Sequence, residues 1–87
     1  MKLFLLERND DTTMEYEIYL SCVVCAKNKK DAKRFHPEGE TLAKIRRRDG
    51  ICFDWPLDEN QITATEIGEA KKEIKRGTII CSSFYNA

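Results

Sequence analysis

The sequence lacks a long apolar run, and this absence argues against two classes of protein. The first apolar stretch, residues 2–6, is followed at once by Glu7 and Arg8. It is therefore too short for the core of a signal peptide or for a membrane-spanning helix. We expect a cytoplasmic protein that does not act at a membrane.

Residues that carry catalysis are also scarce. The single histidine, His36, has no neighbour in the sequence that would complete an acid-base pair. The four glycines are isolated, so there is no glycine-rich phosphate loop, and Ser82 and Ser83 lack the flanking glycines of a nucleophile elbow. The sequence predicts neither a catalytic residue nor a cofactor, and we expect that the chain is not an enzyme.

Four cysteines are present, but no export signal supports disulfide bonds between them. Cys22 and Cys25, with the later Cys52 and Cys81, also resemble an incomplete zinc motif, because four thiolates can close a tetrahedral site. However, Cys52 and Cys81 lie far apart in the sequence. Cys22 and Cys25 are three residues apart in a β-branched run, which directs them to opposite faces of a strand. We expect reduced thiols and no metal.

The 87 residues are enough for one hydrophobic core, which predicts a single domain over residues 1–87. Acidic and basic residues number 15 each, but they are unevenly distributed. Residues 27–48 carry nine basic residues against three acidic ones, and both flanks are acidic. Such a basic block fits an acidic protein surface, a nucleotide or a nucleic acid. The alternative is a solvated face that pairs with the chain's own carboxylates.

Alternation of apolar and polar residues predicts four strands, at residues 2–6, 16–26, 62–67 and 78–85. The polar residues 9–13 predict a hairpin turn between the first two strands. In the second strand a single apolar face is expected from Tyr16, Ile18, Leu20, Cys22, Val24 and Ala26. We expect the first and last apolar runs at the edges of the sheet. Because an open edge can be masked by a second copy, we also expect a homodimer.

Helix signals are weaker. Asn28 as an N-cap predicts a helix of two to three turns that ends before Pro37. Residues 41–50 have capping residues at both ends, but three consecutive arginines leave little apolar face, so we predict a loop with one helical turn. Residues 51–56 fit an edge strand or an aromatic-bearing loop, and residues 69–76 fit a short helix or an extended connection.

The resulting β-β-α-β-β order predicts an α+β fold. It consists of a small antiparallel sheet of about four strands, covered on one face by one or two short helices.

The basic block and the aromatic residues that follow it are the candidate binding residues. Arginine and tryptophan dominate many protein interfaces, and Trp55 follows soon after the arginine run. The candidates are Lys29, Lys30, Lys33, Arg34, Arg46, Arg47, Arg48, Phe53 and Trp55. For Trp55 the alternative is a plug that seals one end of the core. The sequence pI of about 6.6 disfavours a non-specific nucleic-acid protein but is compatible with a compact ligand such as a signalling nucleotide.

Several segments resemble short accessory proteins from bacteriophage and prophage genomes. These segments are the opening Lys-Leu-Phe-Leu-Leu run, the long second strand, the charged stretch that ends in Arg34-Phe35-His36-Pro37, and residues 79–87. The resemblance covers most of the chain apart from residues 38–55. It implies a protein that inhibits a host protein or defence complex, as anti-CRISPR proteins do, in the host cytoplasm. It assigns no functional residue.

Overall fold

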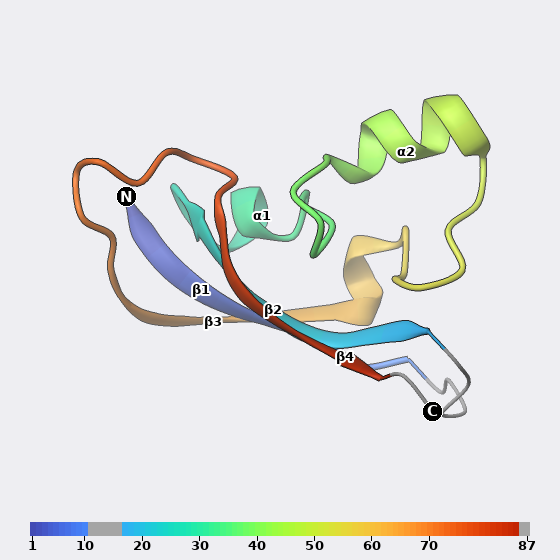
Figure 1. The fold of residues 1–87 in the computed structure, drawn as a ribbon, viewed down its shortest axis with the longest axis horizontal. Helices are drawn as coiled ribbons and strands as arrows, with labels where there is room; N and C mark the ends of the chain where they lie inside the picture. The colour runs from blue at the N-terminus through green and yellow to red at the C-terminus, as the bar shows by residue number, and fades with distance from the viewer. Residues whose placement is uncertain (11–16, 86–87) are drawn as a thin grey trace.

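Four antiparallel strands form one sheet in the computed structural model, which describes residues 1–10 and 17–85 (Figure 1). The strand order is β3-β1-β2-β4, with β1 (Lys2–Arg8), β2 (Ile18–Ala26), β3 (Ile62–Glu69) and β4 (Ile79–Tyr85). The predicted α+β fold with a small antiparallel sheet is confirmed. Tyr16 and most of the predicted hairpin turn lie outside the described residues.

The first apolar run lies in the centre of the sheet, so the prediction that it forms an edge is wrong. β1 pairs with β2 on one side and with β3 on the other. Its side chains explain this position: Phe4 and Leu6 are buried on one face, and Leu3 and Leu5 are half-buried on the other. A strand that is apolar on both faces suits the middle of a sheet. β4 lies at an edge, as predicted.

A bulge in β2 interrupts the single apolar face that strict alternation predicts. Tyr19 pairs with Phe84 and Ser21 pairs with Ser83, which leaves Leu20 without a partner in β4. The extra residue shifts the alternation. Tyr19 therefore packs against the core, and Leu20 is only half-buried.

Helix α1 (Lys29–Ala32) begins as predicted but is shorter. The Asn28 side chain accepts a hydrogen bond from the Asp31 backbone N–H at 2.8 Å, which confirms the N-cap. The Lys33 amide still bonds to the carbonyl four residues back, but the amides of Arg34 and Phe35 bond to carbonyls three residues back, so the helix tightens into turns and ends. These turns direct Phe35 into the core.

Helix α2 (Leu42–Asp49) occupies the segment for which we predicted a loop. Thr41 caps its start by accepting a bond from the Lys44 N–H at 3.2 Å. Gly50 ends it with a φ of 75°. Leu42 and Ile45 are buried, so two apolar residues and two caps suffice for a helix whose other side chains are mostly exposed.

The rest of the chain between α2 and β4 is mostly loop. Residues 51–57 form an aromatic-bearing loop and not an edge strand, and a short 3-10 helix, η1 (Glu59–Gln61), leads into β3. β3 continues through Gly68 to Glu69, and residues 70–78 form an extended connection with turns. None of the described helices has the length and apolarity needed to span a membrane.

The core lies between one face of the sheet and the segments that cover it, namely α1, the start of α2 and the 51–57 loop (Figure 1). Its buried members are Phe4, Leu6, Cys22, Val24, Ala26, Ala32, Phe35, Leu42, Trp55, Ile62 and Ala64. Trp55, the largest of them, closes the layer from the loop side.

Candidate binding site

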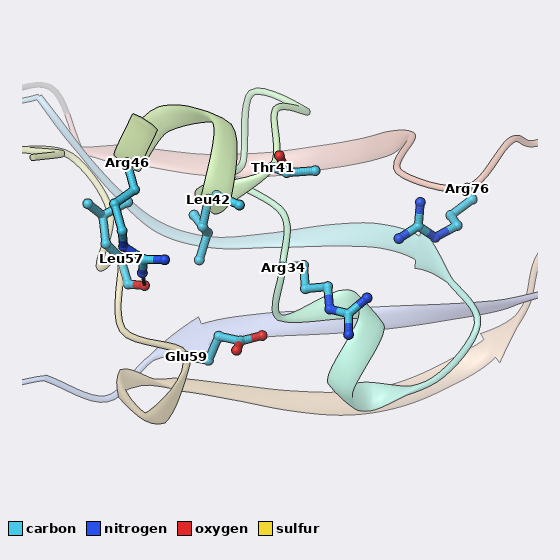
Figure 2. A pocket seen from close by; sticks show the side chains of 8 residues that line it. Arg34, Thr41, Leu42, Arg46, Leu57, Glu59 and Arg76 are labelled. Carbon is cyan, nitrogen blue, oxygen red and sulfur yellow. Dashed lines mark hydrogen bonds between the residues drawn. The ribbon is translucent and has the colours of Figure 1, made fainter. Parts of the chain in front are cut away.

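A cleft of about 390 Å³ opens where α1, α2, the loop at residue 57 and the connection before β4 meet (Figure 2). Three arginines reach it from separate elements: Arg34 follows α1, Arg46 belongs to α2 and Arg76 precedes β4. The other lining residues are Thr41, Leu42, Ala43, Leu57 and Glu59. The cleft therefore combines cationic groups with the apolar surface of the half-buried Leu57 and a single carboxylate.

The three guanidinium groups differ in how firmly they are held. Arg46 donates from Nη2 to the Leu57 carbonyl at 2.6 Å, which ties α2 to the loop. Arg76 donates to both carboxylate oxygens of Asp31 at 2.5 to 3.1 Å and lies 5.0 Å from the centre of the Phe35 ring. The side chain of Arg34 is 54% exposed, and its nearest ion-pair contact is 4.0 Å from Asp31. Arg34 is thus the arginine most available to a ligand.

The buried carboxylate of Asp31 contacts two of the arginines that line this cleft, Arg34 and Arg76. Hydrogen bonds from Arg76, together with the Lys27 backbone N–H at 3.0 Å, hold the pKa of Asp31 below its usual range. The ionised carboxylate fixes Arg76 and with it the connection before β4.

A second hollow of about 370 Å³ adjoins the first. Lys29 and Lys30 of α1 and its C-cap Lys33 line it together with Glu59 and Asn60. Because Glu59 lines both hollows, five of the predicted residues share one continuous surface. We call this surface the cationic face, and it consists of Lys29, Lys30, Lys33, Arg34 and Arg46.

The remaining predicted residues lie elsewhere. Arg48 bonds to Glu40 at 2.8 and 3.3 Å and to Asp49 at 3.0 Å, beside a third hollow of about 710 Å³ that Phe53 also lines. Phe53 is 87% exposed. Arg47 is exposed and lines none of the three hollows found among the described residues. Arg48 thus fits the alternative of a solvated residue that pairs with the chain's own carboxylates.

Trp55 is only 1% exposed, so the hypothesis that it contacts a partner is wrong. It belongs to the core, and the alternative of a plug is the one that the structure supports. Its indole Nε1 is buried and has no hydrogen-bond partner among the described residues.

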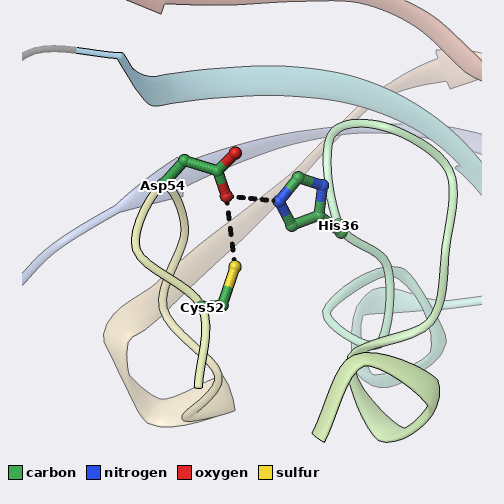
Figure 3. A group of neighbouring side chains, drawn as sticks. All are labelled: His36, Cys52 and Asp54. Carbon is green, nitrogen blue, oxygen red and sulfur yellow. Dashed lines mark hydrogen bonds and ion pairs between the residues drawn. The ribbon is translucent and has the colours of Figure 1, made fainter. Parts of the chain in front are cut away.

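A cluster of His36, Cys52 and Asp54 borders the third hollow (Figure 3). Asp54 Oδ1 lies 2.7 Å from His36 Nε2 and 3.1 Å from Cys52 Sγ. The backbone N–H of Glu38 donates to His36 Nδ1 at 2.9 Å. An imidazole nitrogen that accepts a hydrogen bond carries no proton. The proton of neutral His36 is therefore on Nε2, where it is donated to Asp54.

This tautomer decides what the cluster can do. The three potential ligand atoms lie within 4.8 Å of one another, as a metal site would require. However, a metal at Nε2 would require the ring proton to move to Nδ1, where it would face the Glu38 N–H. Burial and the hydrogen bond to Asp54 also raise the pKa of the Cys52 thiol to about 11, so it is not a ready nucleophile. The geometry fits a hydrogen-bonded clamp between the 36–40 turn and the 51–57 loop.

All four cysteines are free thiols in the structure. Cys22 lies in the core, where burial raises its pKa to about 12. Cys25 is buried outside that cluster, with its sulfur 4.0 Å from the sulfur of Met1. The predicted opposite orientation of these two side chains fits this arrangement.

Comparison of the chain with known protein families, with curated proteins and with solved structures finds no match. The function is therefore inferred from geometry. The sequence offers no sign of Arg76 and Glu59, because each reaches the 390 Å³ cleft from a segment outside the basic block. It also does not predict the cluster of His36 with Cys52 and Asp54, which only the fold brings together.

Proposed function

We propose that the chain is a small non-catalytic binding protein that recognises an acidic surface of a partner protein. One observation carries this proposal: the five residues of the cationic face surround two adjoining hollows. Opposite charge steers a partner to such a face and fixes its orientation. The chain's formal net charge is zero, so the attraction is local to this face.

The chemistry of the cleft supports a protein partner. Leu57, which is half-buried, supplies apolar surface beside Arg34 and Arg46. Protein interfaces combine an apolar centre with arginine anchors and a polar rim. An acidic side chain of the partner would pair with Arg34 while neighbouring apolar atoms cover Leu57.

The resemblance to phage accessory proteins suggests which partner this is. It supports a role as an inhibitor of a host protein or defence complex in the host cytoplasm, similar to anti-CRISPR proteins. An inhibitor of this kind needs only a complementary surface and no catalytic group.

Capture from a bacterial lysate with matched variants tests the proposal. The test variant carries Lys33→Ala and Arg34→Ala. The control variant carries Lys71→Ala and Lys72→Ala, which removes the same charge from exposed positions outside the cationic face. We expect the parent and the control variant to capture one stoichiometric protein that the test variant does not capture, and equal capture by the test variant would contradict the proposal.

A nucleotide ligand is the second candidate, and the size of the cleft favours it. A volume of about 390 Å³ lies at the lower end of the ~300–1,000 Å³ range of small-molecule sites. Here Arg34, Arg46 and Arg76 would contact phosphates, and Leu57 would contact the base. Saturable calorimetric binding of nucleoside triphosphates that Arg34→Ala abolishes would select this function. Binding of a short oligonucleotide instead would indicate nucleic acid.

A further inference from the structure

One acidic side chain lies within the cationic face. Among the described residues that line the two hollows of this face, only Glu59 carries a carboxylate. Glu59 is exposed and takes part in none of the ion pairs formed within residues 1–10 and 17–85. In Figure 2 its carboxylate points into the cleft, and no hydrogen bond joins it to the other side chains drawn. This carboxylate is therefore available to a ligand.

The position of Glu59 divides the positive charge of the face. Because Glu59 lines both hollows, it lies where they adjoin. Arginines line the 390 Å³ cleft on one side of it, and lysines line the 370 Å³ hollow on the other. The surface thus presents positive, negative and positive charge in turn.

We propose that Glu59 is a specificity-determining residue, which selects a partner segment whose basic side chain lies between acidic ones. The basic side chain pairs with Glu59, and the acidic ones pair with Arg34 and with the lysines of α1. Specificity in charged interfaces comes largely from the penalty on like charges that meet. An uninterrupted run of carboxylates brings a like charge against Glu59. The inference rests on the proposed function, because it concerns the same face.

The chemistry around Glu59 favours a protein segment over a nucleic acid. A nucleic-acid backbone carries a negative charge on every unit and supplies no cation for Glu59. Lysine and arginine supply one, on a long aliphatic stem that packs against apolar surface. Leu57 lines the same cleft as Glu59 and is half-buried, so it offers such a surface beside the carboxylate.

Three short peptides test the inference. Each consists of glutamates on both sides of a central residue, which is glutamate, glutamine or lysine. Calorimetry measures their binding to the parent, to Glu59→Gln and to the control Glu73→Gln, which removes an exposed carboxylate outside the cationic face. Neither the N-cap of the 3-10 helix nor its bond depends on the Glu59 side chain, because Asp58 accepts from the Asn60 N–H at 3.0 Å.

We expect the central lysine to be favoured only when Glu59 is present. In Glu59→Gln, affinity should follow the negative charge of the peptide, with the lysine peptide weakest. In the parent and in the Glu73→Gln control, the affinity of the lysine peptide relative to the glutamine peptide should be about two- to fivefold higher than in Glu59→Gln. Glu59→Lys should reverse the preference and bind the all-glutamate peptide most tightly.

A readout from the parent alone needs no variant to fold. The carbon NMR signal of the Glu59 carboxylate should shift further with the lysine peptide than with the glutamine peptide. Equal shifts, or the same ranking of the three peptides in the parent and in Glu59→Gln, would overturn the role of Glu59 and leave the proposed function in place. If none of the peptides binds the cationic face of the parent, both proposals are wrong.

Discussion

At Gly77 the backbone and a neighbouring ring both exclude a side chain. The residue has a φ of 87°, and a Cβ atom there would lie 2.8 Å from Cε1 of Phe35. Its N–H donates to the Cys25 carbonyl at 2.7 Å, so this close approach attaches the connection before β4 to β2. Gly50 has a similar φ of 75°, but a Cβ atom there would have no neighbour within 4 Å. The two glycines therefore share a conformation and differ in their surroundings.

We expect Gly77→Ala to lower the free energy of unfolding far more than Gly50→Ala does. The left-handed conformation costs alanine about 1–2 kcal/mol at either position. At position 77 the contact with Phe35 adds about 1–3 kcal/mol, because the buried ring has little room to move. Urea denaturation of both variants measures the difference. Equal losses would show that the approach of Gly77 to Phe35 is not a tight contact.

Asp31 gives the stability of the fold a defined pH dependence. Its pKa is lowered from an ordinary value of 3.8, chiefly by hydrogen bonds from Arg76, so folding favours the ionised form. A carboxyl with a depressed pKa stabilises the fold above its unfolded pKa and loses that contribution as the pH falls through the folded pKa.

Asp31→Asn should therefore be less stable than the parent at neutral pH, and the difference should shrink below about pH 4 as the parent's carboxyl becomes protonated. Thermal unfolding at a series of pH values measures this. The depressed pKa of Asp10, caused by Arg8, acts in the same direction in both proteins and cancels in the comparison. A difference that is constant with pH would contradict the role of the Asp31 charge.

At the scale of elements, the sequence predicts the strands well, but it does not predict the bulge in β2 or helix α2. Alternation finds all four strands, because period-two patterns are local. It does not predict the bulge at Leu20, which depends on pairing with β4. The sequence does not predict helix α2, because Leu42 and Ile45 are too few beside its arginines to give a clear apolar face. Its capping residues, Thr41 and Gly50, can be recognised in the sequence.

The 51–57 loop is held by the hydrogen-bonded clamp at His36, and this predicts a specific tautomer. Nitrogen NMR should find the ring proton on Nε2 and none on Nδ1, because the Glu38 N–H donates to Nδ1. Added Zn²⁺ should leave both ring signals unchanged, and all four thiols should react after denaturation without reductant. A proton on Nδ1, or one zinc bound per chain, would contradict this account of the cluster.

At the scale of the whole molecule, the basic block divides between two surfaces. Successive residues of a helix point about 100° apart, so the arginine run cannot face one partner. Arg46 lines the 390 Å³ cleft, while Arg48 bonds to Glu40 beside the third hollow. The sequence shows the excess of charge in residues 27–48. It does not show which cations are neutralised, because Glu40, Leu57 and Arg76 take their places only in the folded chain.

A titration with an acidic peptide tests most directly whether the cationic face binds anionic partners. Backbone NMR of the parent, recorded with increasing oligoglutamate, should shift the amides of residues 29–34, of Arg46 and of Glu59, and should saturate. Arg34→Ala with Arg46→Ala should weaken binding about thirtyfold or more, as expected for anchors worth ~2 kcal/mol, while Arg48→Ala leaves it unchanged. Shifts centred on Arg48 and Phe53, or no saturable shifts at all, would contradict the account.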